Sequence, residues 1–349
     1  MSDCEVKMKR FSRRDFLRLM MLGAGSLTLN KYLTACGPKS TPVPPTKYPT
    51  SLPSIPPAPT GLMENTPPPA ATAAGTPLSS PDLVVARGSD PEEMVRRALA
   101  AYGGMQTFIP KGANVVVKPN ICVAYHTYEY AATTNPWLVG ALVKLAFEAG
   151  AGRVQVFDFP FGGSAQEAYV RSGIEEQVKA VGGEMMPMPD FKYVKTDIPN
   201  GVDLKKTKAF KDALEADVLI DVPIAKHHGS ARLSLGMKNL MGLVLDRGAI
   251  HTNLGQRIAD LTTLFRPKLT VVDAIRMLMR HGPSGGNLDD VQKMDTIIVS
   301  PDIVAADSYA TTLFGLQPHD IEYISAASQM GLGNSDLSTL KIEELSVDA

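Results

Sequence analysis

Basic and imidazole side chains gather in one stretch of the chain, residues 217–251. Seven of them occur there: Lys226, His227, His228, Arg232, Lys238, Arg247 and His251. Between Asp221 and Asp246 the stretch holds no carboxylate. It begins with an apolar run at residues 218–222, which predicts a buried strand that Pro223 ends. A buried strand that leads into several cations is a common way for an α/β protein to build a site for an anionic ligand, and we expect such a site here.

Acid–base chemistry at this site would need a titratable group near neutral pH. Two adjacent histidines on an extended chain face opposite sides, so only one of His227 and His228 can reach a given centre. We expect His228 to do so, as a general base or a metal ligand, with Asp273 as its partner. The alternatives are a histidine that only hydrogen-bonds within its own loop and an aspartate that caps or is solvated. No HxxxH or HxH spacing accompanies His228, so metal binding stays open.

Two lysine–asparagine pairs are further candidates for contacts to an anion. Lys118 and Asn120 end the apolar run 115–117, at the sheet edge where α/β proteins bind ligands. Lys238 and Asn239 lie between two glycines, which allow close backbone approach. The alternatives are a solvated lysine beside a turn asparagine, and a helix start that Asn239 caps. The predicted substrate-binding set is Lys118, Asn120, Lys226, Lys238, Asn239, Arg247 and His251.

The elements that must position these residues alternate between strands and helices over residues 82–349. This alternation predicts an α/β fold, with a mostly parallel sheet that carries helices on both faces. The less regular residues 173–210 leave open whether a smaller lobe is inserted. The predicted strands are 83–86, 115–117, 153–157, 218–222, 269–273 and 296–299. The predicted helices follow Asp90 and Ser164 or cover 134–149, 258–265, 302–314 and 320–330.

Residues 1–35 have the order of an export signal. Basic residues lead into Arg13-Arg14 in a twin-arginine pattern, and an interrupted apolar run over 17–29 is too short to span a bilayer comfortably. Residues 33–36, Leu-Thr-Ala-Cys, resemble a bacterial lipobox. We therefore expect the twin-arginine export machinery as a partner. A lipid on Cys36 would then tether the protein to the outer face of the bacterial cytoplasmic membrane, or to the periplasmic side of an envelope membrane. An amphipathic N-terminal helix with a chance cysteine is the alternative.

A proline-rich segment separates this signal from the domain. Residues 36–81 hold 14 of the 27 prolines, many serines and threonines, and a single acidic residue, so they predict an extended, solvated tether. Residues 1–35 carry seven of the 35 basic and three of the 36 acidic residues, so their removal leaves a formal charge of −5. The basic stretch therefore stands on a mildly acidic background, and we expect no nucleic-acid partner.

The cysteine count limits the cofactors. The chain has three cysteines, of which Cys4 belongs to the signal and Cys36 is the predicted lipid site. Only Cys122 remains in the domain, so neither an internal disulfide nor a cysteine-ligated iron–sulfur cluster is expected there. Cys122 itself fits a small buried hydrophobic residue, with a reactive thiol as the alternative.

Several motifs resemble the DUF362 family in the right order over residues 110–315. The motifs are 116–120 (VVKPN), 217–220 (DVLI), Pro223-x-x-Lys226-x-His228, 237–242 (MKNLMG), 269–274 (LTVVDA) and 300–307 (SPDIVAAD). Several members of that family carry extra iron–sulfur motifs, and this chain lacks their cysteines. The family has no assigned function, so the resemblance implies a fold and a site and leaves the reaction open.

Taken together, these patterns predict an exported, membrane-tethered α/β enzyme that acts on a small anionic substrate or organic cofactor. Proton transfer, isomerisation and redox chemistry with a bound cofactor are all compatible with the residues. The alternative is a lipoprotein that binds an anion or a cofactor without turnover. The identity of any cofactor stays open.

Overall fold

The computed structural model describes residues 80–198 and 200–347. The predicted export signal, the lipobox cysteine Cys36 and all of the predicted tether before residue 80 lie outside the described residues. Among the described residues, no helix has both the length and the apolar character needed to cross a membrane.

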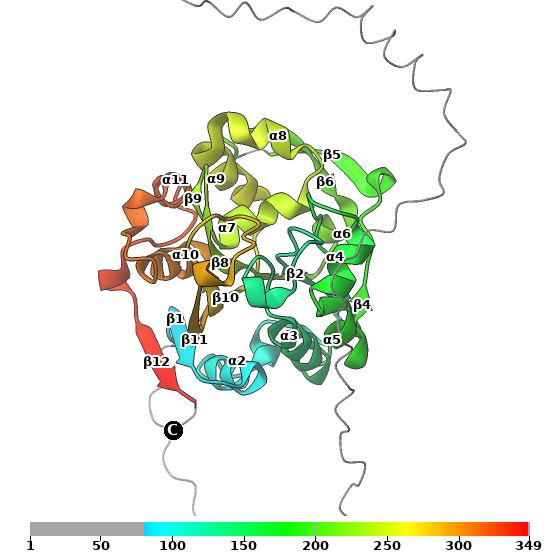
Figure 1. The fold of residues 1–349 in the computed structure, drawn as a ribbon, viewed down its shortest axis with the longest axis vertical. Coiled ribbons are helices and arrows are strands. Elements are labelled where there is room, and N and C mark those ends of the chain that lie inside the picture. Colours follow the sequence, from blue (N-terminus) through cyan, green and yellow to red (C-terminus); the bar gives the residue numbers. More distant parts are fainter. Residues whose placement is uncertain (1–79, 199, 348–349) are drawn as a thin grey trace, which may run out of the picture. The chain divides into compact units, whose positions relative to one another are not determined.

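Twelve strands run through the described residues, and ten of them form one sheet (Figure 1). The strands are β1 (Leu83–Arg87), β2 (Asn114–Pro119), β3 (Arg153–Val156), β4 (Glu184–Met185), β5 (Tyr193–Asp197), β6 (Lys206–Phe210), β7 (Val218–Val222), β8 (Ile224–His228), β9 (Arg232–Ser234), β10 (Leu269–Leu278), β11 (Val291–Ser300) and β12 (Ile342–Ser346). The helices are α2 (Pro91–Ala100), α3 (Pro136–Glu148), α4 (Ala165–Arg171), α5 (Ile174–Ala180), α6 (Lys211–Leu214), α7 (Gly236–Asn239), α8 (Arg247–Ile250), α9 (Leu254–Leu264), α10 (Ile303–Thr312) and α11 (Glu322–Gln329).

The strand order in the main sheet is β12-β1-β11-β10-β7-β2-β3-β4, and β8 pairs with β10 and β9. Neighbours from β10 through β7, β2 and β3 to β4 are parallel, whereas β11 is antiparallel to both β1 and β10. The predicted α/β class with a mostly parallel sheet is therefore confirmed. β12 and the length of β10 and β11 were not predicted.

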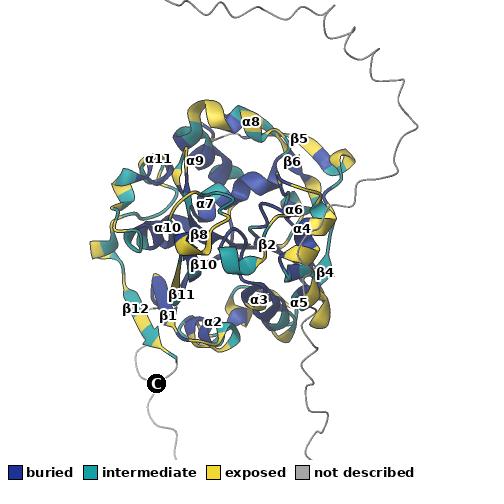
Figure 2. Ribbon diagram, in the orientation of Figure 1, coloured by how far each residue is buried: buried dark blue, intermediate teal, exposed yellow. Residues whose placement is uncertain are grey.

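Helices cover both faces of this sheet, as expected from the alternation of elements. Side chains of α2, α3 and α5 pack on one face, against alternate strand residues such as Val115 and Val117. Side chains of α7, α9, α10 and α11 pack on the other face, where Val116 belongs to their core. Figure 1 shows the two groups of helices on opposite sides of the strands, and Figure 2 shows that the central strands are buried. Because successive strand residues point to opposite faces, one apolar strand serves both cores.

The first turns of the major helices agree with the capping residues read from the sequence. The side chain of Asp90 accepts the N–H groups of Glu92 and Glu93 at the start of α2. Asn135 does the same for α3, and Ser164 forms a reciprocal capping box with Glu167 in α4. These side chains satisfy N–H groups that no helical carbonyl can reach.

Residues 193–210 depart from the main sheet. Here β5 and β6 pair with each other as a separate antiparallel sheet, in the region where the sequence left an inserted lobe open. Their buried residues Tyr193 and Phe210 belong to the same hydrophobic core as α9 and α10. The extra sheet therefore packs into the core of the domain.

The chain does not leave the sheet at Pro223, contrary to the loop expected there. A proline lacks only the N–H donor, and the Pro223 carbonyl still accepts the N–H of Asp273 at 2.8 Å. The chain then continues as β8, which pairs with β10 and then with β9. The basic residues Lys226 and His228 consequently lie on a strand.

Candidate functional site

The site lies where the order of the strands reverses. From β2 the chain proceeds to β3 and β4 on one side of the sheet, and from β7 it proceeds to β10 on the other side. β2 and β7 are parallel neighbours, with Lys118 opposite Asp221. Ligands of open α/β sheets bind at the carboxyl ends of the strands at such a reversal. A ligand site is therefore expected at the residues that follow β2, β3 and β7.

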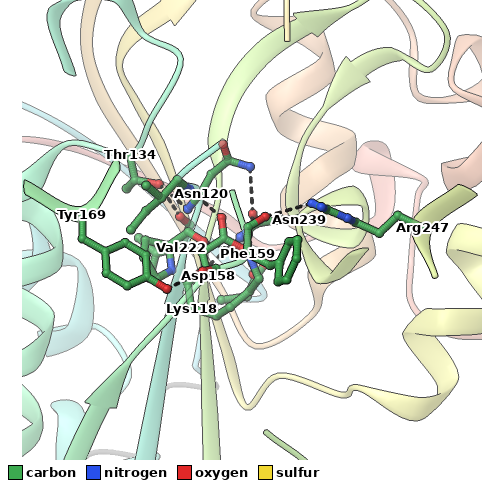
Figure 3. Close-up of polar contacts among 12 residues, drawn as sticks. Lys118, Asn120, Thr134, Asp158, Phe159, Tyr169, Val222, Asn239 and Arg247 are labelled. Carbon is green, nitrogen blue, oxygen red and sulfur yellow. Dashed lines mark hydrogen bonds and ion pairs between the residues drawn. The ribbon is translucent and has the colours of Figure 1, made fainter. Parts of the chain in front are cut away.

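Lys118 is fully buried at the end of β2 and forms an ion pair. Its Nζ lies 2.7 Å from Asp158 Oδ1 and also donates to Asn239 Oδ1 and to the Pro119 carbonyl (Figure 3). Asp158 accepts the backbone N–H of Ile121 through its other oxygen, at 2.5 Å. The ion pair is thus completed by hydrogen bonds on both partners, which a buried charge pair requires.

Asn239 connects the strand ends to α7. Its Oδ1 accepts from Lys118 and from Asn120 Nδ2, both at 3.0 Å. Its Nδ2 donates to the Lys118 carbonyl and to Asp221 Oδ1. The amide therefore uses both donors and both acceptor positions, which fixes its orientation. Its side chain makes no capping bond to the turn that follows at Leu240–Leu243, which excludes the alternative in which it caps a helix start.

Lys226 is the second buried lysine, with 1% of its surface exposed. Its Nζ donates to Asn120 Oδ1 at 2.9 Å, to the Ala132 carbonyl at 2.7 Å and to the Pro283 carbonyl at 3.0 Å. The last of these bonds fastens the glycine-rich segment 282–286 to the site. No carboxylate in the described part of the chain forms an ion pair with Lys226.

A cavity of about 400 Å³ opens beside these residues. Its polar lining includes most of the predicted binding set, and aromatic, thiol and thioether groups supply the rest of the wall. The lining residues are Asn120, Cys122, Asp158, Phe159, Phe161, Lys226, His228, Ser234, Lys238, Asn239, Met241, Gly242, Arg247, His251 and Pro283. Lys118 does not line the cavity itself, but its Nζ donates hydrogen bonds to two residues that do, Asp158 and Asn239. The size and the mixed lining suit a small organic ligand.

The backbone at Gly242 closes over the buried ion pair. A Cβ atom at this position would lie 2.0 Å from Asp158 Oδ1 and 2.8 Å from Lys118 Nζ. Only glycine lets the chain after α7 approach the carboxylate this closely. The glycine that the sequence placed beside Lys238 and Asn239 therefore serves the packing of the site.

Lys238 extends from α7 into the cavity. Its Nζ lies 3.6 Å from the Met241 sulfur, and no oxygen among the described residues accepts a hydrogen bond from it. Burial, together with repulsion from Lys226 and then Arg247, lowers the pKa of Lys238 to about 8. Asp307 fixes the helix that carries this lysine, because its two oxygens accept the N–H groups of Gly236 and Met237.

His228 faces the same cavity from β8. Its Nδ1 accepts the N–H groups of Ser230 and Ala231 at 3.1 and 3.2 Å, so the neutral ring carries its proton on Nε2. Burial, followed by the charges of Lys238 and Lys226, lowers the pKa of His228 to about 3. A neutral ring with a fixed Nε2–H suits a hydrogen-bond donor better than the general base expected from the sequence.

Arg247 and His251 lie at the outer wall, on α8 and just after it. Arg247 donates to the Phe159 carbonyl at 2.8 Å and stacks over the Phe159 ring at 4.4 Å. Burial lowers its pKa, and among the described residues it forms no ion pair. His251 is exposed, and its Nδ1 lies 2.8 Å from the Arg247 carbonyl. Arg247 therefore presents the rest of its guanidinium to the cavity.

Asp273 does not reach this cavity. Its carboxylate is buried and accepts the backbone N–H groups of Asn135 and Ile275 at 2.7 and 3.0 Å. Burial raises its pKa to about 7, against the effect of these two bonds. The structure therefore does not bring Asp273 to His228, and its contacts hold the start of α3 against β10. Of the two alternatives for Asp273, a capping and a solvated aspartate, the bonds to backbone N–H groups agree with the first.

Asp158 was not expected from the sequence, although it is the carboxylate that completes the site. It lies two residues beyond β3, so its place at a strand end was the available signal. Its partner Lys118 is 40 residues away, and no spacing rule connects the two. The aromatic residues Phe159 and Phe161 follow on the same segment and form one wall of the cavity.

The described residues contain no group of three or more His, Cys, Asp or Glu side chains that could hold a metal ion. Cys122 is a buried free thiol, and its Sγ lies 3.2 Å from the Ala132 carbonyl and 3.4 Å from the Pro283 carbonyl. Cys122 lines the cavity next to Pro283, the residue whose carbonyl accepts a hydrogen bond from Lys226.

The family model described as "Domain of unknown function (DUF362)" matches residues 115–312, which is more than half of the chain. The chain belongs to the DUF362 family. The resemblance read from the sequence motifs is thereby confirmed. The matched range contains every residue that lines the cavity, so the site is a part of the DUF362 domain.

One curated relative is the thylakoid-associated protein sll1697 of Synechocystis sp. It is 28% identical over 247 residues, which cover 68% of this DUF362 chain and 74% of the relative. Two solved structures are more distant. The lactate racemase apoprotein from Thermoanaerobacterium thermosaccharolyticum has 15% identity and a TM-score of 0.38, with 58% of this chain and 52% of that chain covered. A protein from Thermotoga maritima has 12% identity and a TM-score of 0.29, with 53% and 51% covered. The alignments thus span about half the length of each solved structure.

Proposed function

We propose that this DUF362 protein is an enzyme that binds a small organic anion in the cavity and transfers a proton at it. The observation that carries the proposal is the pair of cavity cations, Lys238 and Arg247, neither of which forms an ion pair with a carboxylate of the described residues. A carboxylate or phosphate of the ligand would supply the missing charge. Strong hydrogen bonds of this kind are favoured where donor and acceptor are both ionised.

The apolar part of the wall indicates that the ligand is organic. Phe159, Phe161 and Met241 line the cavity beside the cations, and a simple inorganic anion would leave their surface in contact with water. The His228 Nε2–H would donate to an oxygen of the ligand. Lys238, with a pKa of about 8, is the group that can give or take a proton near neutral pH.

The first experiment measures anion binding by the full-length protein in mild detergent. Pyruvate, lactate, glyoxylate and phosphorylated three-carbon acids are titrated by calorimetry. Arg247→Gln should weaken the binding of an anion that binds by about 10- to 100-fold, which is the usual range for a lost charge-assisted hydrogen bond. Arg232→Gln is the matched control, since Arg232 lies outside the cavity lining and pairs with Asp320. No binding, or an equal loss in both variants, would contradict the proposal.

A second readout separates catalysis from binding alone. The bound anion is incubated in D₂O, and deuterium uptake is followed by NMR at C2 of lactate and at C3 of pyruvate, the carbon beside its carbonyl group. Exchange that disappears in Lys238→Met supports an enzyme. Binding without exchange in the wild type supports the alternative, a lipoprotein that holds an anion or hands a cofactor to a partner.

We also propose that the protein is exported by the twin-arginine route and held at the membrane by a lipid on Cys36. The support is the order of charge, apolar run and lipobox in residues 1–36, together with a relative whose name records association with thylakoids. Cys36→Ala should move the protein from the membrane to the soluble fraction of the exported compartment. Arg13→Lys with Arg14→Lys should keep it in the cytoplasm. Membrane association that is unchanged in Cys36→Ala would refute the anchor.

A further inference from the structure

The lysine on α7 has surroundings unlike those of the two other lysines at the site. Lys118 and Lys226 each donate hydrogen bonds to three oxygens, and one acceptor of Lys118 is a carboxylate. Lys238 has only the Met241 sulfur within hydrogen-bonding distance among the described residues. A thioether is a weak acceptor. Lys238 is therefore the one of these three lysines whose nitrogen is not held by oxygen acceptors.

Its neighbours also disfavour the ammonium form. Lys226 and Arg247 line the same cavity and repel a third positive charge, and Met241, Phe159 and Phe161 add thioether and aromatic surface to its wall. A desolvated lysine beside other cations is the arrangement that keeps an amine unprotonated and nucleophilic. With a pKa of about 8 instead of 10.5, Lys238 would hold about 300 times more free amine at pH 7 than an ordinary exposed lysine.

From this geometry we infer that Lys238 is a nucleophile that forms an imine with the carbonyl group of a small 2-oxo acid. This inference rests on the proposed function and adds the substrate class and a covalent step. Arg247 would bind the carboxylate of the acid, and the His228 Nε2–H would donate to the oxygen of its carbonyl group. The apolar wall would accept the remaining carbon chain.

The step balances without a further reactant. The free electron pair of Lys238 Nζ attacks the carbonyl carbon, a nitrogen–carbon bond forms, and the carbonyl oxygen takes up a proton. The nitrogen then loses a proton. The hydroxyl group takes up another proton and leaves as water, so that a protonated carbon–nitrogen double bond remains. Such an imine withdraws electrons from the adjacent carbon and would ease the proton transfer proposed above.

The test is reductive trapping with full-length protein. The protein is incubated with pyruvate or glyoxylate and sodium cyanoborohydride, digested, and searched by mass spectrometry for lysines that carry the reduced acid. We expect modification at Lys238 with a half-maximal rate near pH 8. The exposed lysines of the same chain, such as Lys195, serve as internal controls and should react about 300-fold more slowly at pH 7.

Two variants and one binding measurement make the outcome decisive. Lys238→Arg should give no adduct at this position, and Arg247→Gln should need a higher concentration of acid for the same yield. Calorimetry on the unreduced protein reports binding of the same acid. Binding without an adduct at Lys238, or labelling of Lys238 no faster than of Lys195, would overturn the imine and leave the proposed anion site intact. No binding of either acid by calorimetry, and no adduct at Lys238, would contradict both. The mapping uses the wild-type chain, so it does not depend on the folding of a variant.

Discussion

Lys118 and Lys238 lie at the same site, yet their surroundings differ in almost every respect. Lys118 is fully buried and has a carboxylate, an amide oxygen and a carbonyl as partners. Lys238 is partly exposed to the cavity and has a thioether. A buried charge with complete partners is compatible with a stable fold, whereas one without them is costly and is typical of functional sites. The comparison assigns Lys118 to the architecture of the site and Lys238 to its chemistry.

The largest expected effect follows from removing the partner of Lys118. Asp158→Asn removes the ion-pair partner of the buried Lys118 ammonium, so the free energy of unfolding should fall by about 3–5 kcal/mol. Urea denaturation measures this loss. The matched control is Glu344→Gln, which breaks an exposed pair with Arg87 and should cost less than about 1 kcal/mol. Similar small losses in both variants would show that the buried pair does not support the fold.

Replacing Lys238 is expected to increase the free energy of unfolding, whereas Asp158→Asn decreases it. Its pKa is lower in the folded protein, about 8, than in the unfolded chain, 10.5, so the unfolded chain binds more protons between these values. The stability of the ligand-free wild type should therefore rise from pH 8 to pH 10.5. Lys238→Met removes the penalty and should be more stable at pH 7 by up to about 3 kcal/mol.

Urea denaturation of both proteins at pH 7, 9 and 10 checks this prediction. The difference between Lys238→Met and the wild type should shrink as the pH rises. If Lys238→Met is less stable than the wild type at pH 7, Lys238 is required for the stability of the fold, as Lys118 is.

The smallest effect is expected at the outer wall. His251 is exposed and contacts the site through the Arg247 carbonyl, so His251→Gln should change the affinity for an anion by less than about threefold. Calorimetry under the conditions used for Arg247→Gln provides the comparison. A loss as large as that of Arg247→Gln would show that the imidazole itself binds the anion.

Much of the fold could be predicted because local signals agree with the tertiary structure. Pro136 after Asn135 begins α3, and the apolar runs that become β2 and β7 are long enough to be recognised as buried strands. β8 could not be predicted, since Pro223 suggests an end to pairing and only the whole sheet shows that its carbonyl pairs with β10. β12 is partly exposed and lies at the edge of the sheet, so its sequence has no clear apolar run.

The residues of the site also divide into those that the sequence predicts and those that only the fold reveals. Lys226, Lys238 and Arg247 could be predicted, because a run of cations without acids is visible in the sequence. Asp158 and the pairing of Lys118 could not, because they depend on two strand ends that meet only in the folded sheet. Asp273 is the last residue of the predicted strand 269–273 and is the predicted partner of His228. In the structure the strand continues to Leu278, so the carboxylate lies within β10 and away from the cavity.

Lys226 adds a different kind of selectivity. Its three oxygen acceptors belong to three separate segments, so every proton of its ammonium is already engaged. In this arrangement Lys226 attracts an anionic ligand in the cavity through its charge but donates no hydrogen bond to it. Such a residue favours the binding of negatively charged ligands, whatever the orientation of the ligand in the cavity. Discrimination between anions of similar charge and different shape then falls to the groups with fixed direction, the guanidinium of Arg247 and the Nε2–H of His228.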